Sequence, residues 1–210
     1  MKKKIAVFAI LLAAFVTAGR AQESRQDISL SGTGWIEPFM ASSTDVQVNS
    51  TPAYGAVVSY RFMLTPTSAL EASYGITYQN KITYHSNSFP PTGIQILTRT
   101  QEISGAYVRS FVFKNWNPFV EAGPGALIFL PIVNSGTRGT LDSKQQTEVG
   151  GMYGAGFAFE VSPSFDIRAE YRGFVTKVPN FGLSGPSTED LTTNRWYNIS
   201  VPTIGVAYHF

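Results

Sequence analysis

The chain has 210 residues, with 16 basic and 14 acidic side chains and no cysteine. This length allows one β-domain and a leader, and the lack of cysteine excludes a disulfide framework and a thiolate metal site. The small net charge, +2 with neutral histidines, gives no basic surface for nucleic acid.

The N-terminus has the three parts of a secretory signal peptide: lysines at 2–4, an apolar run over 5–16 and small residues up to Ala21. The apolar run is too short for a transmembrane helix of about 20 residues. We therefore expect a signal peptide over 1–21, cleaved after Ala21 or alternatively after Gly19, and a mature domain over 22–210. Removing the leader leaves 12 basic and 14 acidic residues, so the apparent basicity belongs to the export signal.

The mature chain alternates apolar and polar residues with a period of two, which predicts β-strands. The first two strands are expected at about 28–39 and 53–63. The third, at about 69–79, alternates most regularly, with Tyr74 and Ile76 on one face and Glu71 on the other. The remaining strands are expected at 99–113, at 118–130, on either side of the 162–164 turn, and at 196–210.

Short and long connections strictly alternate between these eight strands. The short ones are expected at 64–68, 114–117 and 162–164, and the long ones at 40–52, 80–98, 131–146 and 177–194. This asymmetry is typical of outer-membrane barrels, which have short periplasmic turns and longer outer loops. Closure is required because an unpaired backbone group in hydrocarbon costs several kcal/mol. The sequence therefore predicts an all-β, eight-stranded, antiparallel up-and-down transmembrane β-barrel.

Charged residues in the middle of the strands share the parity opposite to the aromatic and aliphatic side chains, so we expect them to face the lumen. They are Arg61, Glu71, Glu121, Glu160, Arg168, Glu170 and Arg172. Glycines at 123, 125, 154 and 156 have the inner parity too and make room for long side chains. Because an eight-stranded barrel is only wide enough for side chains, we interpret these charges as a structural network that fills the lumen.

The segments PFVEAGPGALIF (118–129) and YGAGFAFEVSPSFDIRAEYRGF (153–174) and the terminal GVAYHF resemble the OmpA-like and OmpX-like outer-membrane β-barrel family. The resemblance implies a monomer in the outer membrane of a Gram-negative bacterium, in contact with lipid and lipopolysaccharide, and without the peptidoglycan-binding domain of OmpA-type proteins. It also implies that the barrel assembly machinery reads the alternating C-terminal residues Ile204, Val206, Tyr208 and Phe210.

Three residues depart from this pattern. Pro124 and Pro202 lie inside predicted strands, where each removes a ladder hydrogen bond, and a bulge or a position near a rim would accommodate them. Arg109 shares the parity of the outward Tyr107 and Phe111. Either the strand has a bulge there, or the side chain extends to the membrane interface.

No residue pattern indicates a catalytic centre, a metal site or a cofactor. A lipid A-modifying barrel enzyme would need a His/Ser pair braced by an acid, but His85-Ser86 lies in a segment rich in chain breakers, and His209 is expected at the periplasmic rim. The tryptophans at 35, 116 and 196 are interpreted as interfacial aromatic residues.

We therefore expect a non-catalytic barrel that contributes to envelope integrity or to surface interaction through its four long loops, with an unknown ligand. A small porin-like channel is the alternative. A soluble lipocalin-like carrier fits less well, because Gly32-Thr33-Gly34-Trp35 misses the Gly-x-Trp spacing of that class and the chain ends in a strand.

Overall fold

The computed structural model describes residues 25–41, 46–113, 116–135, 142–184 and 190–210, so the predicted signal peptide lies outside the described residues. Within these ranges no helix is long and apolar enough to cross a bilayer. The strands are β1 (Gln26–Trp35), β2 (Met40–Ala41), β3 (Gln47–Ser50), β4 (Ala53–Thr65), β5 (Ser68–Thr77), β6 (Asn80–His85), β7 (Ile94–Ser110), β8 (Trp116–Ser135), β9 (Gln146–Ser162), β10 (Phe165–Lys177) and β11 (Trp196–His209).

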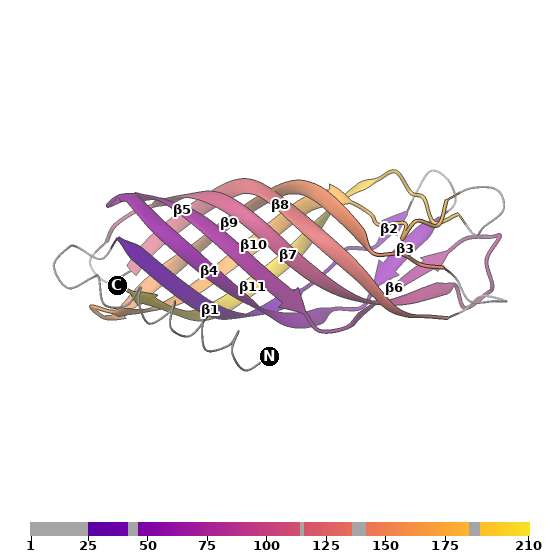
Figure 1. Ribbon diagram of the computed structural model, residues 1–210, viewed down its shortest axis with the longest axis horizontal. Coiled ribbons are helices and arrows are strands. Elements are labelled where there is room, and N and C mark those ends of the chain that lie inside the picture. The colour runs from indigo at the N-terminus through magenta and orange to yellow at the C-terminus, as the bar shows by residue number, and fades with distance from the viewer. Residues whose placement is uncertain (1–24, 42–45, 114–115, 136–141, 185–189) are drawn as a thin grey trace, which may run out of the picture.

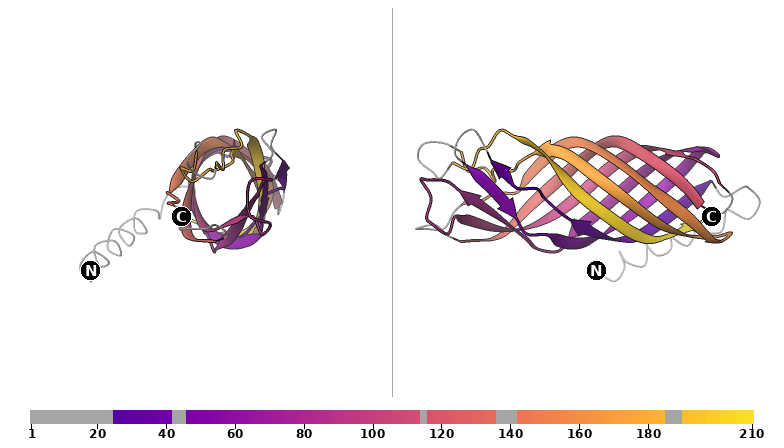
Figure 2. Two further views of the ribbon diagram at one scale, coloured as in Figure 1. Left: turned by 90° about the vertical axis from the view of Figure 1, so that its right-hand side faces the viewer. Right: turned by 180° about the vertical axis from the view of Figure 1, so that it is seen from behind.

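Eight of these strands close a ring in which every pairing is antiparallel. The order is β1, β4, β5, β7, β8, β9, β10 and β11, and β11 pairs with β1 to complete it. The end-on view in Figure 2 shows the closed ring directly. The predicted eight-stranded antiparallel barrel is confirmed.

The two ends of the barrel differ as the alternating connections predicted. At one end, here the tight-turn end, β4 and β5 are separated only by residues 66–67, and β9 and β10 only by 163–164. Part of the third predicted short turn, residues 114–115, lies outside the described residues. At the opposite, long-loop end, β2, β3 and β6 extend the wall beyond the ring, on the right of Figure 1.

This extension corrects two of the predicted long loops. The 80–98 segment forms β6 and the beginning of β7, paired from Asn80↔Thr98 to Tyr84↔Ile94, and 40–52 contains β2 and β3. Ile82, Tyr84, Ile94 and Ile96 point inward and are buried, so the period of two continues past the ring. The chain breakers at 90, 91 and 93 occupy only the tip of this hairpin.

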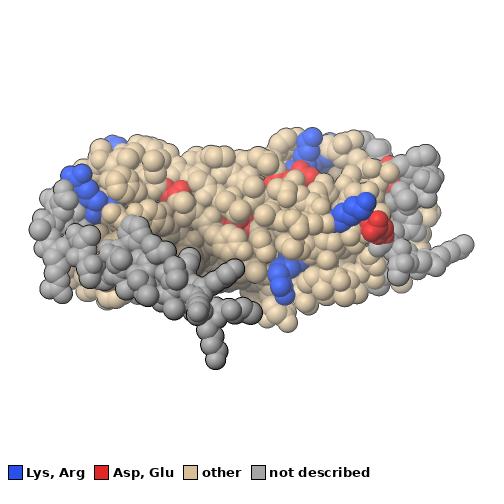
Figure 3. Space-filling view, in the orientation of Figure 1, with Lys and Arg blue, Asp and Glu red and all other residues tan. Residues whose placement is uncertain are grey.

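The two faces of the wall have the inverted polarity that the sequence predicted. The outward side chains of Tyr74, Ile76, Phe157 and Ile167 are 40–52% exposed. The inward side chains of Glu71 and Arg168 are 5% and 3% exposed. Figure 3 shows a band without Lys or Arg between the blue side chains near the tight-turn end and those in the long-loop half. A wall of this kind is suited to a surrounding of hydrocarbon.

Both prolines interrupt one ladder without shifting its register. The β7–β8 pairing omits Gly105 and Ala106, opposite Pro124 and Gly123, and resumes in the same register. The regular β1–β11 pairing ends at Thr33↔Thr203, just before Pro202. Neither site is a bulge. Each proline lacks one N–H and so interrupts the ladder on one side of its strand, while the ladder on the other side continues through Pro124↔Gly151 and Tyr171↔Pro202.

Arg109 lies on the outer face, near the tight-turn end. The β7 ladder is regular around it, so the strand has no bulge there. Its Nη1 donates a hydrogen bond of 2.8 Å to Ser68 Oγ. Of the two alternatives for this residue, the structure excludes the bulge and leaves the side chain on the outer face.

Candidate functional site

The lumen is filled in two layers, and the inward residues of β10 run through both. From the tight-turn end these residues are Asp166, Arg168, Glu170 and Arg172, followed by Phe174. The change from ionic to apolar falls between Arg172 and Phe174, where the guanidinium carbon lies 5.4 Å from the centre of the ring. The period of two places all of these side chains on the inner face of the barrel.

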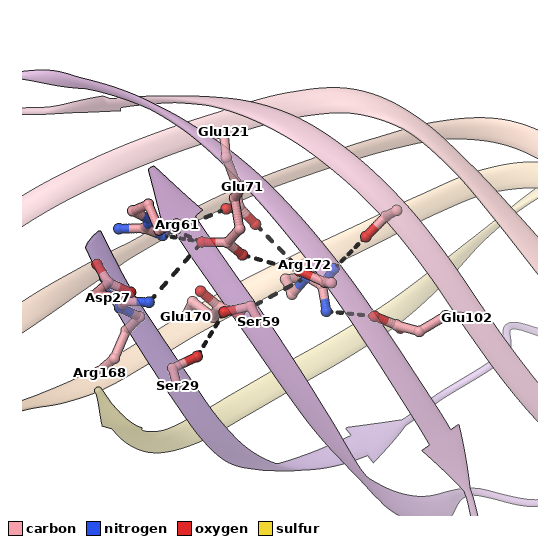
Figure 4. Close-up of polar contacts among 12 residues, drawn as sticks. Asp27, Ser29, Ser59, Arg61, Glu71, Glu102, Glu121, Arg168, Glu170 and Arg172 are labelled. Atoms are coloured by element: carbon pink, nitrogen blue, oxygen red, sulfur yellow. Dashed lines mark hydrogen bonds and ion pairs between the residues drawn. The ribbon is translucent and has the colours of Figure 1, made fainter. Parts of the chain in front are cut away.

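Arg172 is the centre of the ionic layer and is fully buried. Its Nη1 lies 2.6 Å from Glu102 Oε1, and its Nη2 donates to Ser104 Oγ at 2.9 Å. Its Nε lies 3.7 Å from Glu121 Oε1 and 3.8 Å from Glu170 Oε1. One guanidinium therefore serves three carboxylates that come from three different strands (Figure 4).

Two further arginines occupy the part of the layer nearer the tight-turn end. Arg61 Nε donates to Glu71 Oε2 at 2.8 Å, and its guanidinium carbon lies 4.7 Å from the centre of the Phe119 ring. Arg168 Nη2 donates to Asp27 Oδ2 at 3.1 Å. The side chains in Figure 4 point toward one another from β1, β4, β5, β7, β8 and β10. The Arg61–Glu71 bond joins the neighbouring strands β4 and β5, whereas the Arg168–Asp27 bond and the Arg61–Phe119 contact join strands that are distant in the sequence.

The structure brings together six of the seven predicted inward charges and corrects the seventh. Glu160 is exposed, because it lies near the β9–β10 turn, where the register shifts and the wall no longer encloses it. Sequence reasoning missed Asp27 and Glu102, both of which are buried. Glu102 could have been found from its parity, since it alternates with the outward Ile103, whereas Asp27 precedes the predicted start of the first strand.

The ionic layer contains more carboxylates than arginines. Three arginines face the carboxylates of Asp27, Glu71, Glu102, Glu121 and Glu170. The predicted glycines do make room for them: a Cβ on Gly154 would lie 2.6 Å from Glu121 Oε1, and one on Gly156 would lie 2.6 Å from Glu170 Cβ. Backbone and side chains therefore fill this part of the lumen together.

A small cavity lies between the ionic layer and the tight-turn end. It measures about 90 Å³ and is lined by Asp27, Arg61, Arg168 and His209, among others. His209 Nε2 is 2.8 Å from Asp166 Oδ2, at the rim where the sequence placed this histidine. His85 lies at the end of β6, beyond the opposite end of the ring, so the two histidines cannot form one site. Among the described residues, no group of three or more His, Cys, Asp or Glu could hold a metal.

The layer toward the long-loop end is apolar, which sequence reasoning missed. Trp35 is 1% exposed and its ring lies 6.1 Å from that of Phe174, so the interpretation of Trp35 as an interfacial residue is wrong. Trp116 and Trp196 are exposed on the outer face, as expected. Leu127, Phe129, Met152 and Ile199 complete the layer. The parity of Trp35 could have indicated its burial, because Trp35 alternates in phase with the buried Ser29 and Ser31 and out of phase with the outward Ile28 and Leu30.

The described residues between β10 and β11, 178–184 and 190–195, lie across the mouth of the barrel. Phe181 is fully buried and makes edge contacts with Tyr84 and Phe129 at 6.5 Å between ring centres. Tyr84 Oη donates to the carbonyl of Pro179 at 2.7 Å, and Gln146 Oε1 accepts the backbone N–H of Phe181. This predicted loop therefore closes the lumen with Phe181, Leu183 and Leu191, all of which are buried.

One buried carboxyl supports this mouth. Glu37, between β1 and β2, accepts hydrogen bonds from Trp35 Nε1 at 2.9 Å and from Asn80 Nδ2 at 3.0 Å. Burial raises the pKa of Glu37, and the hydrogen bonds from Trp35, Ser50 and Asn80 only partly oppose that shift. The group therefore links the end of β1 to the extension formed by β3 and β6.

The chain was compared with known proteins. The family described as outer membrane protein beta-barrel domain matches residues 6–210. No curated protein matches the chain. The solved outer membrane protein OprG from Pseudomonas aeruginosa is similar, with a TM-score of 0.62 and 11% identity over 90% of this chain and 97% of that one. The solved structure of Neisserial surface protein A is also similar, with a TM-score of 0.58 and 14% identity over 89% of this chain and 98% of that one. At such identities the likeness to both structures concerns the fold alone.

Proposed function

The chain belongs to the outer membrane β-barrel family, and from this premise we propose that it is a non-catalytic surface protein with a filled lumen. It would contribute to envelope integrity or to surface interaction through its four long connections. Membership of the family places the protein in the outer membrane, in contact with its lipids. In such barrels the tight turns face the periplasm, so the extension of β2, β3 and β6 faces the outside.

The observation that carries the proposal is the double filling of the lumen. An ion or solute entering from the outside would meet Phe181 and Tyr84 first, both fully buried, and then the contacts around Arg172. Displacing the first layer exposes apolar surface, and crossing the second separates buried ion pairs, which costs several kcal/mol for each unpaired ion. Two independent barriers in series support a plugged barrel over a conducting one.

A small porin-like channel is the second candidate. The cavity beside Arg61 and Arg168 at the periplasmic end favours it, because polar side chains there offer water a way into the ionic layer. In this alternative the segment around Phe181 would be a gate.

Conductance in planar bilayers separates the two functions. Purified protein, shown to be folded by its heat-modifiable gel mobility, should give no steady openings across a range of applied voltages. The matched variant replaces residues 179–193 by a short glycine-serine linker and should also remain closed, because the ionic layer is intact. Steady openings in the unmodified protein would overturn the proposal of a filled lumen. Openings only in the linker variant would identify residues 179–193 as a gate.

We also propose that export uses a cleaved signal peptide and that assembly uses the last strand. N-terminal sequencing of the mature protein should begin at Gln22. Ile204, Val206 and Tyr208 alternate on the outer face of β11, where a partner strand or the assembly machinery can reach them. Deleting Phe210, whose ring stacks on Tyr208 at 6.1 Å, should lower the yield of folded barrel in cells more than in vitro. A single monomeric species in detergent is expected.

A further inference from the structure

A groove runs along the outer face of the barrel where β5 ends and β6 begins. It has a volume of about 350 Å³ and is lined by Tyr54, Gly55, Ile76, Thr77, Tyr78 and Arg99. The strand breaks here because the β5–β7 pairing ends at Ile76↔Gln101 and the β6–β7 pairing resumes at Asn80↔Thr98. The Thr77 side chain bridges the gap: its Oγ1 donates to the Thr100 carbonyl at 3.2 Å and accepts the Thr100 N–H at 2.9 Å. The wall thus stays closed while its outer surface is hollowed.

The groove lies at the level of the outer membrane interface. Tyr54 and Tyr78 are exposed on the outer face, with their rings stacked at 5.3 Å and only 4° apart. Exposed aromatic rings at the end of the apolar band mark the boundary between hydrocarbon and headgroups. Ile76, two residues closer to the middle of the wall than Tyr78, is exposed to the hydrocarbon side of that boundary.

Two exposed cations lie at the groove: Arg99 lines it and Lys81 lies beside it. Arg99 is exposed on the outer face of β7, and Lys81 is exposed on the same face of β6, diagonally across the ladder because Lys81 pairs with Leu97. Within the described part of the chain, neither makes an ion pair with a carboxylate. Diagonal neighbours of this kind lie about 7–8 Å apart at their Cα atoms, so two long side chains can converge on one anion.

We propose that this groove binds the phosphate-bearing headgroup of an outer-leaflet lipid. One phosphate lies between Arg99 and Lys81, and an acyl chain runs over Ile76 beside the stacked Tyr54 and Tyr78. The guanidinium fits a phosphate because it presents paired donors to two oxygens, and the ammonium adds a second charge. The apolar floor below a cationic rim distinguishes a lipid from a free anion. The inference depends on the outer-membrane location and is independent of whether the lumen conducts.

The test measures lipid retained by the full mature protein. Protein is folded into phosphatidylcholine vesicles that contain a minor fraction of lipid A, extracted in mild detergent, and the bound lipid is counted by native mass spectrometry. The double variant Arg99→Gln/Lys81→Gln is compared with Lys177→Gln/Arg195→Gln. The control pair removes the same charge from β10 and from the residue preceding β11, where Lys177 lies 5.9 Å from the Trp196 ring. Heat-modifiable mobility verifies that every variant is folded.

We expect the Arg99/Lys81 variant to retain at least about tenfold less lipid A, since two charge-assisted contacts are lost, and the control pair to retain the wild-type amount. The proposal is overturned if both pairs lose lipid equally, which would indicate general attraction by surface charge. It is also overturned if dephosphorylated lipid A is retained as well, or if inorganic phosphate at equal concentration displaces the lipid, since the site would then recognise only the chain or only a free anion. Conductance of the same variants stays at the wild-type level, so failure here is distinguishable from failure of the plugged-lumen proposal.

Discussion

Replacing Arg172 by methionine should destabilise the barrel more than any other single change in the ionic layer. Methionine keeps most of the volume and removes the charge. It leaves Glu102 without its partner at 2.6 Å and takes the only cation within 4 Å from Glu170, among the contacts of the described residues. Removing one partner of a buried ion pair typically costs about 3–5 kcal/mol, because the remaining charge has neither water nor a counter-ion. We expect a loss of that size in the free energy of unfolding.

Equilibrium unfolding in urea measures this loss, with protein folded into phospholipid vesicles and followed by heat-modifiable gel mobility. The control is Arg109→Met on the outer face, which loses one hydrogen bond, to Ser68, among the described residues and should cost under about 1 kcal/mol. The double variant Arg172→Met/Glu102→Gln should recover about 1–3 kcal/mol, since it removes the stranded carboxylate as well. If Arg172→Met is no less stable than Arg109→Met, the ionic layer does not hold the barrel together and the reasoning fails.

Three further outcomes are expected. Gly156→Ala should lower the free energy of unfolding by about 1–3 kcal/mol in the same urea assay, because its Cβ would lie 2.5 Å from the Ala169 carbonyl oxygen. The control Gly151→Ala, whose Cβ would have nothing within 4 Å, should stay within about 0.5 kcal/mol of wild type. Equal effects of the two substitutions would contradict a tightly filled lumen. Phe181→Ala should make the 178–195 segment sensitive to added protease while the ring keeps its heat-modifiable mobility, and unchanged cleavage would mean that Phe181 does not hold the segment in place. Burial raises the pKa of Glu37 above 4.5, so the folded state favours the protonated carboxyl, and this contribution to stability is present below pH 4.5 and is lost as the pH rises through the raised pKa. Relative to Glu37→Gln, wild-type protein should therefore lose stability between acidic and neutral pH, and parallel pH profiles would refute this role.

Sequence reasoning predicted the ring because its evidence is local. Tyr74 and Glu71 fall on opposite faces in any strand, whatever lies next to it, and the alternation of turn lengths needs no knowledge of pairing. The same rule placed Arg61, Arg168 and Arg172 on one face, and the closed ring then brings them together. Only the identity of their partners depends on register, which the alternation alone does not give.

The apolar mouth was missed because its evidence is not local. Phe181, Leu183 and Leu191 follow no period, and their burial depends on distant contacts such as the bond from Tyr84 Oη to the Pro179 carbonyl. The hairpin of β6 and β7 was assigned to a loop because its polar composition and its prolines outweighed a short alternation. Composition describes the tip of this hairpin well, but it says little about the strands on either side of the tip, which also pair with β3 and β8.

The division of the lumen into two layers follows from what each kind of contact can specify. Arg168 joins β10 to Asp27 on β1 across the intervening β11, and Arg172 joins β10 to Glu102 on β7 across the lumen. Such contacts are directional and are satisfied in one arrangement of the strands, so they favour one register for the closing ring; this is the role in which buried ion pairs are best supported. Apolar contacts around Phe174 and Phe181 tolerate several arrangements, which suits a region that accommodates an irregular segment. A barrel with the layers exchanged would place its least adaptable contacts where the described chain is most irregular. It would also leave the tight-turn half, where the start of β1 pairs with the end of β11, without a directional constraint on its register.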